Sequence, residues 1–290
     1  MKFMLFILSF PCFCFVIDEE LMKHAKEEKT ITQSEQVTLS FYSINFQDPN
    51  NKFYVIVKKI HDKRDLSLIK EELCSGEKIF KKQDFGNTYA VLDMNDEIWF
   101  IMEPILGADL RTVLMHIPEE DLDNALRYYI AAVAVKNYLL EELGIKWGDE
   151  HPGNVMIDAF SGQVKLIDFG LSEKLNPSNK SGAYRRIGRY NLDLLTPEGN
   201  PRWKKLSTSK DRDNALEYLS SSDFKIKEFR NLAWFKRFSF EDINLLYFPR
   251  SAIKEENWIF YNTIKDKIVT PNMVDRFYRS SSLVHINCSG

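Results

Sequence analysis

Residues 147–170, WGDEHPGNVMIDAFSGQVKLIDFG, constrain this chain more than any other stretch. Two carboxylates, Asp149 and Asp168, stand among glycines, and Asn154 follows the first carboxylate by five positions. Short apolar runs separate these polar residues, and this pattern predicts strands joined by turns. We therefore expect all three side chains on turns between apolar strands, and we treat them as candidate functional residues.

The composition is that of an ordinary globular protein and argues against a nucleic-acid-binding protein. With 290 residues, the chain can form one large domain or two small ones. The net charge of −3 provides no electrostatic footprint for nucleic acid, so we predict no nucleic-acid partner.

The N-terminus has the pattern of a secretory signal peptide over residues 1–17. Lys2 precedes the apolar run FMLFILSFPCFCFVI, and three acidic residues follow at positions 18–20. The run is shorter than the roughly 20 residues that a membrane span needs, and Cys12-Phe13-Cys14 serves as a small-residue cleavage site. We predict cleavage, no membrane span afterwards, and a linker over residues 18–29. A retained signal anchor and a buried first helix are the alternatives.

Cysteine usage adds little to the prediction of a secreted protein. Four cysteines are present, and Cys12 and Cys14 lie in the predicted signal peptide. Cys74 and Cys288 remain after cleavage, and two cysteines are too few for a disulfide framework. The sequence leaves open whether these two form a bridge.

The rest of the chain divides into a strand-rich part and a helix-rich part. Residues 30–104 carry β-branched and aromatic strand patterns with one helical pattern, over residues 65–82, that Gly76 interrupts. Residues 105–290 begin within the IMEPILGADL segment, which is the predicted boundary, and contain a long amphipathic pattern that starts after Pro118 and stops at Gly144. Weaker helical patterns follow at 210–222 and 253–267. The chain is predicted to be an α+β protein with two lobes.

The opening stretch resembles the catalytic loop and the metal-binding motif of the protein kinase superfamily, which read D-x-x-x-x-N and D-F-G. The resemblance extends over roughly residues 30–220, because other motifs stand in the family's order. Val55-Ile56-Val57-Lys58 is similar to the strand-lysine motif, and residues 99–103 are similar to the gatekeeper strand and hinge. The resemblance implies a small antiparallel sheet with one helix in the N-lobe and a mainly helical C-lobe.

This resemblance also implies a role for each candidate residue in ATP- and Mg²⁺-dependent phosphoryl transfer. Lys58 would hold the α- and β-phosphates, and Glu77, nineteen residues later, would pair with that lysine. Asp149 would accept the proton of the hydroxyl group or orient it. Asn154 and Asp168 would supply oxygen ligands to magnesium.

The hinge residues Glu103, Ile105 and Asp109 are implied to bind the nucleotide, with Asp109 at the ribose.

Several assignments leave an alternative open. Lys59 stands beside Lys58, Glu71 and Glu72 compete with Glu77, and Asp109 fits the N-cap of a helix equally well. His151, where protein kinases commonly have lysine, fits a hydrogen bond within its own loop.

Four features depart from the protein kinase pattern. The family has a glycine-rich loop over the phosphates, but this chain has no glycine before Gly76, so donors from Ser34 and Thr38 or a low nucleotide affinity are expected. Ile56 replaces a small alanine and narrows the adenine slot. Gly148 replaces an arginine that reads an activation-loop phosphate, so we predict no dependence on such a phosphate. An Ala-Pro-Glu motif is missing after the D-F-G motif, and Asp211 or Asp213 is the candidate anchor for the catalytic loop.

Three functions remain open at this stage. The first is a divergent secreted kinase that phosphorylates a protein hydroxyl, and its substrate would be a host protein if the kinase is exported into a host cell. The second is a pseudokinase that binds a protein partner without chemistry, because the glycine-rich loop is missing and Ile56 is large. The third is a small-molecule kinase, because His-Pro-Gly-Asn at 151–154 resembles the aminoglycoside and choline kinase-like enzymes.

Overall fold

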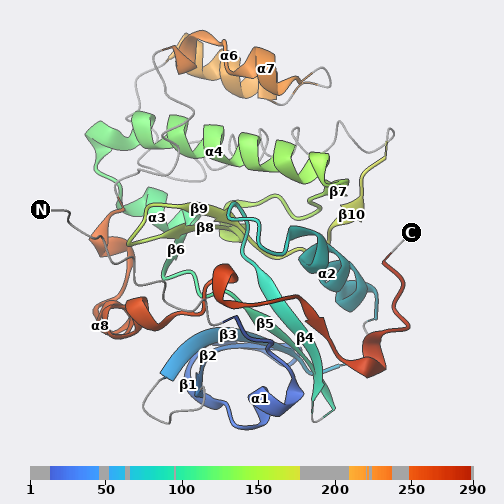
Figure 1. Cartoon of the computed structure of the whole chain (residues 1–290). Coiled ribbons are helices and arrows are strands. Elements are labelled where there is room, and N and C mark those ends of the chain that lie inside the picture. The colour runs from blue at the N-terminus through green and yellow to red at the C-terminus, as the bar shows by residue number, and fades with distance from the viewer. Residues whose placement is uncertain are drawn as a thin grey trace, which may run out of the picture.

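The computed structural model describes residues 14–45, 52–62, 66–94, 96–176, 209–219, 221, 224–236 and 248–288. This part of the chain forms two lobes, one built on a curved sheet and one on helices (Figure 1). The predicted α+β, two-lobed protein kinase-like architecture is confirmed. None of the described helices is long and apolar enough to cross a membrane.

The N-lobe contains a six-stranded sheet in the order β1-β2-β3-β5-β4-β11. Neighbouring strands are antiparallel except β11, which runs parallel to β4. The strands are β1 Lys26–Gln33, β2 Val37–Asn45, β3 Lys52–Ile60, β4 Thr88–Met94, β5 Glu97–Met102 and β11 Tyr278–Arg279. Strands β2, β3, β4 and β5 match the aromatic and β-branched strand patterns predicted for the first lobe, whereas β1 and β11 were not predicted.

Helices cover both faces of this sheet. Helix α1 (Glu19–Lys23) lies in the hollow of its curved outer face, and α2 (Leu66–Ile79) packs on the other side (Figure 1). Because side chains alternate along a strand, Val55 and Val57 join the core under α1, whereas Ile56 and Lys58 face the cavity between the lobes. The alternation in β3 therefore brings Lys58 to the site.

The C-lobe is organised around α4 (Leu122–Glu142), which is the long helix predicted from the pattern between Pro118 and Gly144. Gly144, at φ +71°, ends it in the left-handed conformation that glycine adopts without strain. The remaining elements are α3 Leu110–His116, β6 Gly107–Asp109, β7 Ile145–Lys146, β8 Val155–Asp158, β9 Val164–Leu166, β10 Glu173–Lys174, α6 Lys210–Leu219 and α7 Ile226–Phe229. Strands β6, β8 and β9 form a small sheet beneath the cavity, and β7 pairs with β10.

The predicted boundary at residue 17 and the predicted linker over residues 18–29 are wrong. Ile17 is fully buried in the N-lobe core, and the Phe15 nitrogen donates to the Met273 carbonyl at 3.0 Å. Helix α1 and the first half of β1 occupy the linker range. Residues 1–13 lie outside the described part, so the folded domain begins no later than Phe15.

The prediction that residues 105–290 all belong to the C-lobe is also wrong. Helix α8 (Glu255–Ile264) packs against the N-lobe sheet, where the ring centroids of Phe41 and Phe260 lie 5.0 Å apart. After α8 the chain supplies β11 to the same sheet and ends against α2, where Cys288 is disulfide-bonded to Cys74 (Figure 1). Local sequence patterns carry no signal for such long-range pairing.

Helix α6 confirms the helical pattern at 210–222 but not its predicted role. Asp211 and Asp213 are exposed on α6, and the buried Arg212 faces Asp123 of α4 at 3.3 Å. The helix therefore packs on α4, and the prediction that one of its aspartates anchors the catalytic loop is wrong.

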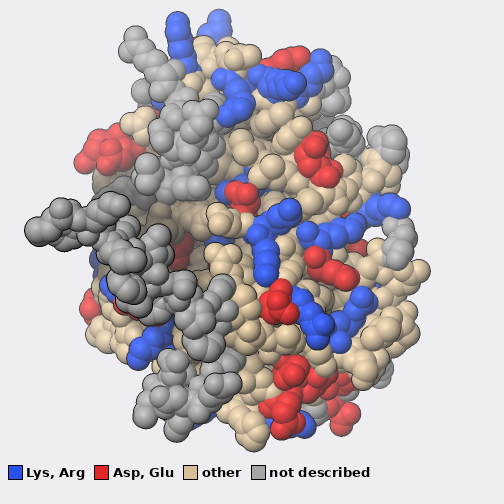
Figure 2. All heavy atoms as spheres, viewed as in Figure 1, with Lys and Arg blue, Asp and Glu red and all other residues tan. Residues whose placement is uncertain are grey.

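Surface charge agrees with the composition. On the face shown in Figure 2, outside the grey residues, acidic and basic side chains are interspersed and do not gather into a basic patch.

Candidate active site

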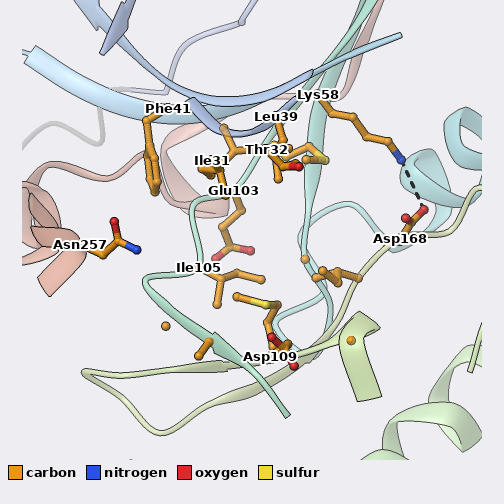
Figure 3. Close-up of a pocket in the computed structure, with 18 of the residues that line it drawn as sticks. Ile31, Thr32, Leu39, Phe41, Lys58, Glu103, Ile105, Asp109, Asp168 and Asn257 are labelled. Carbon is orange, nitrogen blue, oxygen red and sulfur yellow. Dashed lines mark hydrogen bonds and ion pairs between the residues drawn. The ribbon is translucent and has the colours of Figure 1, made fainter. Parts of the chain in front are cut away.

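A cavity of about 680 Å³ lies between the lobes, and five of the candidate residues line it: Lys58, Glu103, Ile105, Asp109 and Asp168. The catalytic loop lines it through Gly153, whereas Asp149, Asn154 and Glu77 are not among the lining residues. The β1–β2 hairpin and β3 form its roof, the hinge after β5 forms its back, and β8 with the D-F-G segment forms its floor. Lys58 and Asp168 face each other at one end, and Asn257 lies at the other (Figure 3).

Lys58 is the centre of a charged triad at this end. Its Nζ lies 2.7 Å from Oε2 of Glu72 and 3.3 Å from Oδ1 of Asp168 (Figure 3). Burial by itself would lower the pKa of Lys58, but the negative charges of Glu72 and Asp168 outweigh it and hold this pKa above its ordinary value. Lys58 therefore stays protonated and is held ready for an anion.

The choice of Lys58 over Lys59 is confirmed. Lys59 points to the opposite face of the sheet, where its Nζ lies 5.0 Å and 4.7 Å from the ring centroids of Tyr42 and Trp99. It also contacts Glu27 there at 3.2 Å. Adjacent residues in a strand face opposite sides, so only one of the two lysines reaches the cavity.

The predicted ion-pair partner, Glu77, is wrong, and Glu72 takes its place. Glu72 is almost fully buried beside Lys58, whereas Glu77 is half-exposed and lies 3.5 Å from Arg279. Five positions along an α-helix turn a side chain by about 140°, so the two glutamates cannot face the same neighbour. Spacing from Lys58 failed because the connection between β3 and α2 has no fixed length.

The catalytic loop confirms the predicted grouping of Asp149 with Asn154. The 3₁₀ turn Pro152–Asn154 brings the Asn154 Nδ2 within 2.8 Å of Asp149 Oδ2 and 3.1 Å of the Asp149 carbonyl oxygen, and it donates to both. Because the amide nitrogen is used in this way, the side-chain oxygen is the atom of Asn154 that suits a cation. The carboxylate of Asp149 is held in place by this contact with Asn154 from the same loop.

The side chain of His151 forms a hydrogen bond within this loop. The Gly153 nitrogen donates to His151 Nδ1 at 3.0 Å, so the ring proton of a neutral His151 lies on Nε2. That Nε2 is 3.4 Å from Oδ2 of Asp149. The alternative in which His151 makes a hydrogen bond within its own loop is therefore confirmed.

Asp168 is held in an unusual backbone conformation that sequence reasoning did not anticipate. Its φ is +57°, a region that non-glycine residues adopt only where the surroundings enforce it. Trp147 Nε1 donates to the Asp168 carbonyl at 3.1 Å, and Phe169 is buried against Phe85 with ring centroids 6.2 Å apart. The one feature in the sequence that relates to this conformation is Trp147, an aromatic residue just before Gly148 and Asp149, because its indole nitrogen contacts the Asp168 carbonyl.

Packing explains why a glycine stands at position 148, where the protein kinase pattern has an arginine. A Cβ atom at this position would lie 1.8 Å from the carbonyl oxygen of Leu171. The arginine that many protein kinases have at this position would not fit here unless the backbone after the D-F-G motif moved. The predicted independence from an activation-loop phosphate stays a prediction.

The roof has no glycine-rich loop, and the predicted substitutes are engaged elsewhere. Ser34 Oγ accepts hydrogen bonds from the nitrogens of Val37 and Gln36 and closes the β1–β2 turn. Thr38 Oγ1 lies 3.0 Å from His61 Nε2. The hairpin instead covers the cavity with its strand residues Ile31, Thr32, Val37 and Leu39.

The three predicted hinge residues all line the cavity. The Glu103 carboxylate forms a buried ion pair with Lys165 at 2.5 Å, which leaves the backbone of Glu103 as the part suited to a base. Asp109 accepts from the Thr112 nitrogen at 3.0 Å and caps α3, so its N-cap role is confirmed while its ribose role stays a prediction. Ile105 contributes an apolar surface next to them.

Helix α8 supplies lining residues that sequence reasoning missed. Asn257 and Tyr261 border the hinge end of the cavity, and the Lys29 Nζ donates to Asn257 Oδ1 at 2.5 Å. Both lie outside the stretch that resembles protein kinases. Ile56 packs in the same cluster as Tyr261 and lines the roof of the cavity, and its narrowing of the adenine slot stays a prediction.

The donor set at the charged end fits a magnesium ion. Asp168 offers a carboxylate, Asn154 offers an amide oxygen, and the described residues contain no cluster of three or more histidine, cysteine or acidic side chains that would form a complete metal cage. Magnesium suits such a sparse site, because it is usually bound by one or two carboxylates together with substrate phosphates and water.

Known proteins show the same family signature. The sequence profile of the family described as "Protein kinase domain" matches residues 44–198, just over half of the chain. Citron rho-interacting kinase of Rattus norvegicus is 33% identical over 110 residues, which cover 38% of this chain and 5% of that protein. Serine/threonine-protein kinase RUNKEL of Arabidopsis thaliana is 35% identical over 103 residues, covering 34% of this chain and 7% of that protein.

A third relative, serine/threonine-protein kinase Warts of Drosophila melanogaster, is 30% identical over 125 residues, which cover 42% of this chain and 10% of that protein. The chain thus spans about a tenth or less of the length of these relatives. The profile match covers the strand lysine, the hinge, the catalytic loop and the D-F-G motif, which are the elements that meet in the cavity. This chain belongs to the protein kinase domain family.

Proposed function

We propose that the protein is an ATP- and magnesium-dependent protein kinase that transfers the γ-phosphate to a serine or threonine hydroxyl. The observation that carries the proposal is the assembled triad, in which Lys58 contacts both Glu72 and Asp168. A lysine fixed by one carboxylate beside a second, partly exposed carboxylate suits a metal-bound triphosphate. The names of the relatives above support serine or threonine as the acceptor.

Each residue has a task that follows from its position. Lys58 binds the α- and β-phosphates, and Glu72 keeps its ammonium group pointed into the cavity. Asp168 and Asn154 would hold a magnesium ion, which would neutralise charge on the phosphates. Asp149, oriented by Asn154 and His151, accepts the hydrogen bond of the incoming hydroxyl group and takes its proton.

A pseudokinase is the second candidate, because of the roof. Ile56 is buried where the adenine ring would lie. The Ser34 hydroxyl accepts a hydrogen bond from the Val37 nitrogen within the β1–β2 turn and so does not face the cavity as a donor. Backbone donors over the phosphates are a large part of nucleotide affinity in this family. A protein of this kind would keep the fold, bind Mg-ATP weakly or not at all, and act through a protein partner.

Calorimetry with Mg-ATP separates the two candidates. Wild-type protein is expected to bind Mg-ATP, and Asp168→Ala is expected to lose the magnesium-dependent part of the affinity. Lys59→Ala is the matched control, because Lys59 leaves the same strand on the opposite face. Folded wild-type protein that binds no nucleotide would favour the pseudokinase.

Transfer is tested separately with γ-labelled ATP and generic protein substrates. Label that depends on Asp149 and Asp168 supports the kinase. ATP turnover that a metabolite stimulates, and that proteins do not, would point instead to a small-molecule kinase.

We also propose that the protein acts in the secretory pathway or outside the cell. The apolar N-terminal run and the disulfide between Cys74 and Cys288 support this location, because disulfides persist in oxidising compartments. N-terminal sequencing of protein recovered from the medium of expressing eukaryotic cells tests it. A mature chain that begins at Phe15 is expected, and an uncleaved Met1 on cytosolic protein would contradict the proposal.

A further inference from the structure

The C-terminal segment, defined here as residues 277–288, is fastened to helix α2 along two helical turns. Cys288 is disulfide-bonded to Cys74, and their Cα atoms lie 5.2 Å apart. One turn further along α2, Glu77 lies 3.5 Å from Arg279. These two contacts are on the same face of the helix, because Cys74 and Glu77 are three residues apart.

Aromatic packing continues this attachment toward the end of α2. The ring of Phe277 meets Phe80 edge-on, with centroids 6.2 Å apart. A methyl group added at Gly76 would already lie 3.6 Å from Phe277. The C-terminal segment therefore follows the outer face of α2 closely, with little space between them.

The same segment is anchored in the N-lobe sheet. Strand β11 pairs with β4, the Ser280 nitrogen donates to the Val91 carbonyl at 3.0 Å, and the Asp93 nitrogen donates to Ser280 Oγ at 2.8 Å. Leu283 and Ile286 are buried in the cluster between the sheet and α2. The segment thus connects a rigid sheet to a helix that otherwise rests on one side of it (Figure 1).

The position of α2 decides whether the charged triad can form. Glu72 and Cys74 are two residues apart, so their side chains leave the helix in nearly opposite directions, about 160° apart, one toward Lys58 and the other toward the C-terminal segment. On the inner side, Ser75 Oγ also lies 2.6 Å from Ser172 Oγ, just after the D-F-G motif. A small rotation or outward shift of α2 separates Glu72 from Lys58.

We propose that the C-terminal segment, closed by the Cys74–Cys288 disulfide, is the positioning element that holds α2 in its working place. The oxidised protein keeps the Lys58–Glu72 pair assembled, and the reduced protein releases α2 and loses phosphoryl transfer. The proposal rests on the kinase function proposed above. It makes the activity of this protein dependent on the redox state of its surroundings.

Reduction by a dithiol accounts for all atoms and electrons. One thiolate of the reductant attacks a sulfur of the bridge, the other bridge sulfur leaves as a thiolate, and the second thiol of the reductant resolves the mixed disulfide. The protein gains two electrons and two protons as two thiols, and the reductant becomes its own cyclic disulfide. Oxidation by a disulfide of the same class reverses the exchange.

The test uses the full chain carrying Cys12→Ser and Cys14→Ser, which leaves Cys74 and Cys288 as its two cysteines. Two properties are measured before reduction with dithiothreitol, after it, and after reoxidation. The first is kcat/KM for Mg-ATP in the transfer assay, and the second is amide hydrogen exchange in residues 66–79. On reduction, kcat/KM is expected to fall by about a hundredfold, since misplacing a catalytic group by an ångström has an effect of this size.

Exchange in α2 is expected to speed up at the same time, while cooperative thermal unfolding shows that the fold persists. Reoxidation is expected to restore both properties, which a merely unfolded protein would not do. The Cys288→Ser variant in the same background should behave like the reduced protein and should not respond to dithiothreitol. If this variant does not fold, reduction of the folded protein decides the question without it.

A reduced protein with unchanged kcat/KM and unchanged exchange in α2 overturns the proposal. Unchanged activity with faster exchange also overturns it, because the segment would then hold α2 without positioning Glu72 for catalysis. Absent transfer in both redox states counts against the kinase function. In that case Mg-ATP affinity replaces kcat/KM, and a redox-dependent affinity together with faster exchange supports the positioning role.

Discussion

The indole nitrogen of Trp147 donates a hydrogen bond to the backbone carbonyl of Asp168 at 3.1 Å. Trp147 is buried, and Asp168 stands at φ +57°, a conformation that costs about 1–3 kcal/mol and persists only where neighbouring groups enforce it. The indole thus helps to keep the Asp168 carboxylate directed at Lys58. The residue just before the catalytic loop and the residue that would bind magnesium are therefore connected through one hydrogen bond.

Replacing Trp147 by phenylalanine tests this connection. Trp147→Phe keeps an aromatic ring but leaves the Asp168 carbonyl without its donor, so the free energy of unfolding is expected to fall by about 1–3 kcal/mol. Mg-ATP affinity should fall as well, because Asp168 is freed from its constrained conformation. Urea unfolding and calorimetry measure the two effects.

Trp99→Phe is the matched control for this variant. Trp99 also donates through its indole nitrogen, to Glu97 at 3.0 Å, but it does so on the α1 side of the N-lobe sheet. We expect a stability loss without a change in Mg-ATP affinity. If Trp147→Phe likewise leaves affinity unchanged, the hydrogen bond has no role in placing Asp168.

The correction from Glu77 to Glu72 can be tested on the helix itself. Glu72→Gln removes the charge that faces Lys58, and kcat/KM for Mg-ATP is expected to drop by about a hundredfold, as for other misplaced catalytic groups. Glu77→Gln should have a smaller effect, because an exposed pair such as Glu77 with Arg279 contributes about 0–1 kcal/mol. Steady-state kinetics of both variants beside Glu71→Gln, a control from the same helical turn, gives the ranking. Equal losses for Glu77 and Glu72 would restore the pairing predicted from the sequence.

The residues that sequence predicts well lie within one continuous stretch. Asn154 contacts Asp149 within one short turn, and Asp168 follows a short strand that leads into the cavity, so local spacing was enough to identify these residues. Lys58 was predicted equally well, because the alternation of β3 places either Lys58 or Lys59 at the cavity and the neighbouring apolar residues decide between them. The two lobes followed from hydrophobic periodicity alone.

Features that join distant parts of the chain were missed. Glu72 reaches Lys58 across a connection of variable length, and the C-terminal segment reaches α2 across a sequence separation of 214 residues. The contacts that place α8 beside the hinge come from aromatic side chains, which in sequence look like any other core residues. No local pattern encodes which of two apolar surfaces will meet, and this is why the C-lobe boundary was wrong.

Shortening Ile56 tests whether the roof limits nucleotide affinity. Ile56→Ala removes three carbons from a buried position that lines the cavity, so Mg-ATP is expected to bind more tightly. The free energy of unfolding without nucleotide should fall by about 2–5 kcal/mol, as for other buried isoleucines. Calorimetry and urea unfolding measure the two opposite trends.

Val57→Ala provides the comparison from the same strand. Val57 is fully buried but faces α1, so this variant should lose stability without any gain in affinity. An Ile56→Ala protein that binds Mg-ATP no better than wild type would show that Ile56 does not narrow the adenine slot.

Acid should weaken the N-lobe through Glu27 on β1. The hydrogen bond from Tyr42, at 2.6 Å, is the largest influence, and with further bonds from Thr30, Ser40 and Lys59 it lowers the pKa of Glu27 from 4.5 to about 2. A carboxyl group whose pKa is lower in the folded state contributes stability above its unfolded pKa and loses that contribution as the pH falls through the folded pKa. The contribution of Glu27 is therefore complete above pH 4.5 and declines toward pH 2.

Glu27→Gln removes this titration, so the decline in the free energy of unfolding between pH 5 and pH 2 should be shallower in the variant than in the wild type. Urea unfolding at a series of pH values measures both slopes. Glu35→Gln, on the exposed β1–β2 turn, is the control and should keep the wild-type slope. Parallel slopes for Glu27→Gln and wild type would mean that the hydrogen bonds from Tyr42 and its neighbours do not favour the charged form of Glu27 in the folded protein.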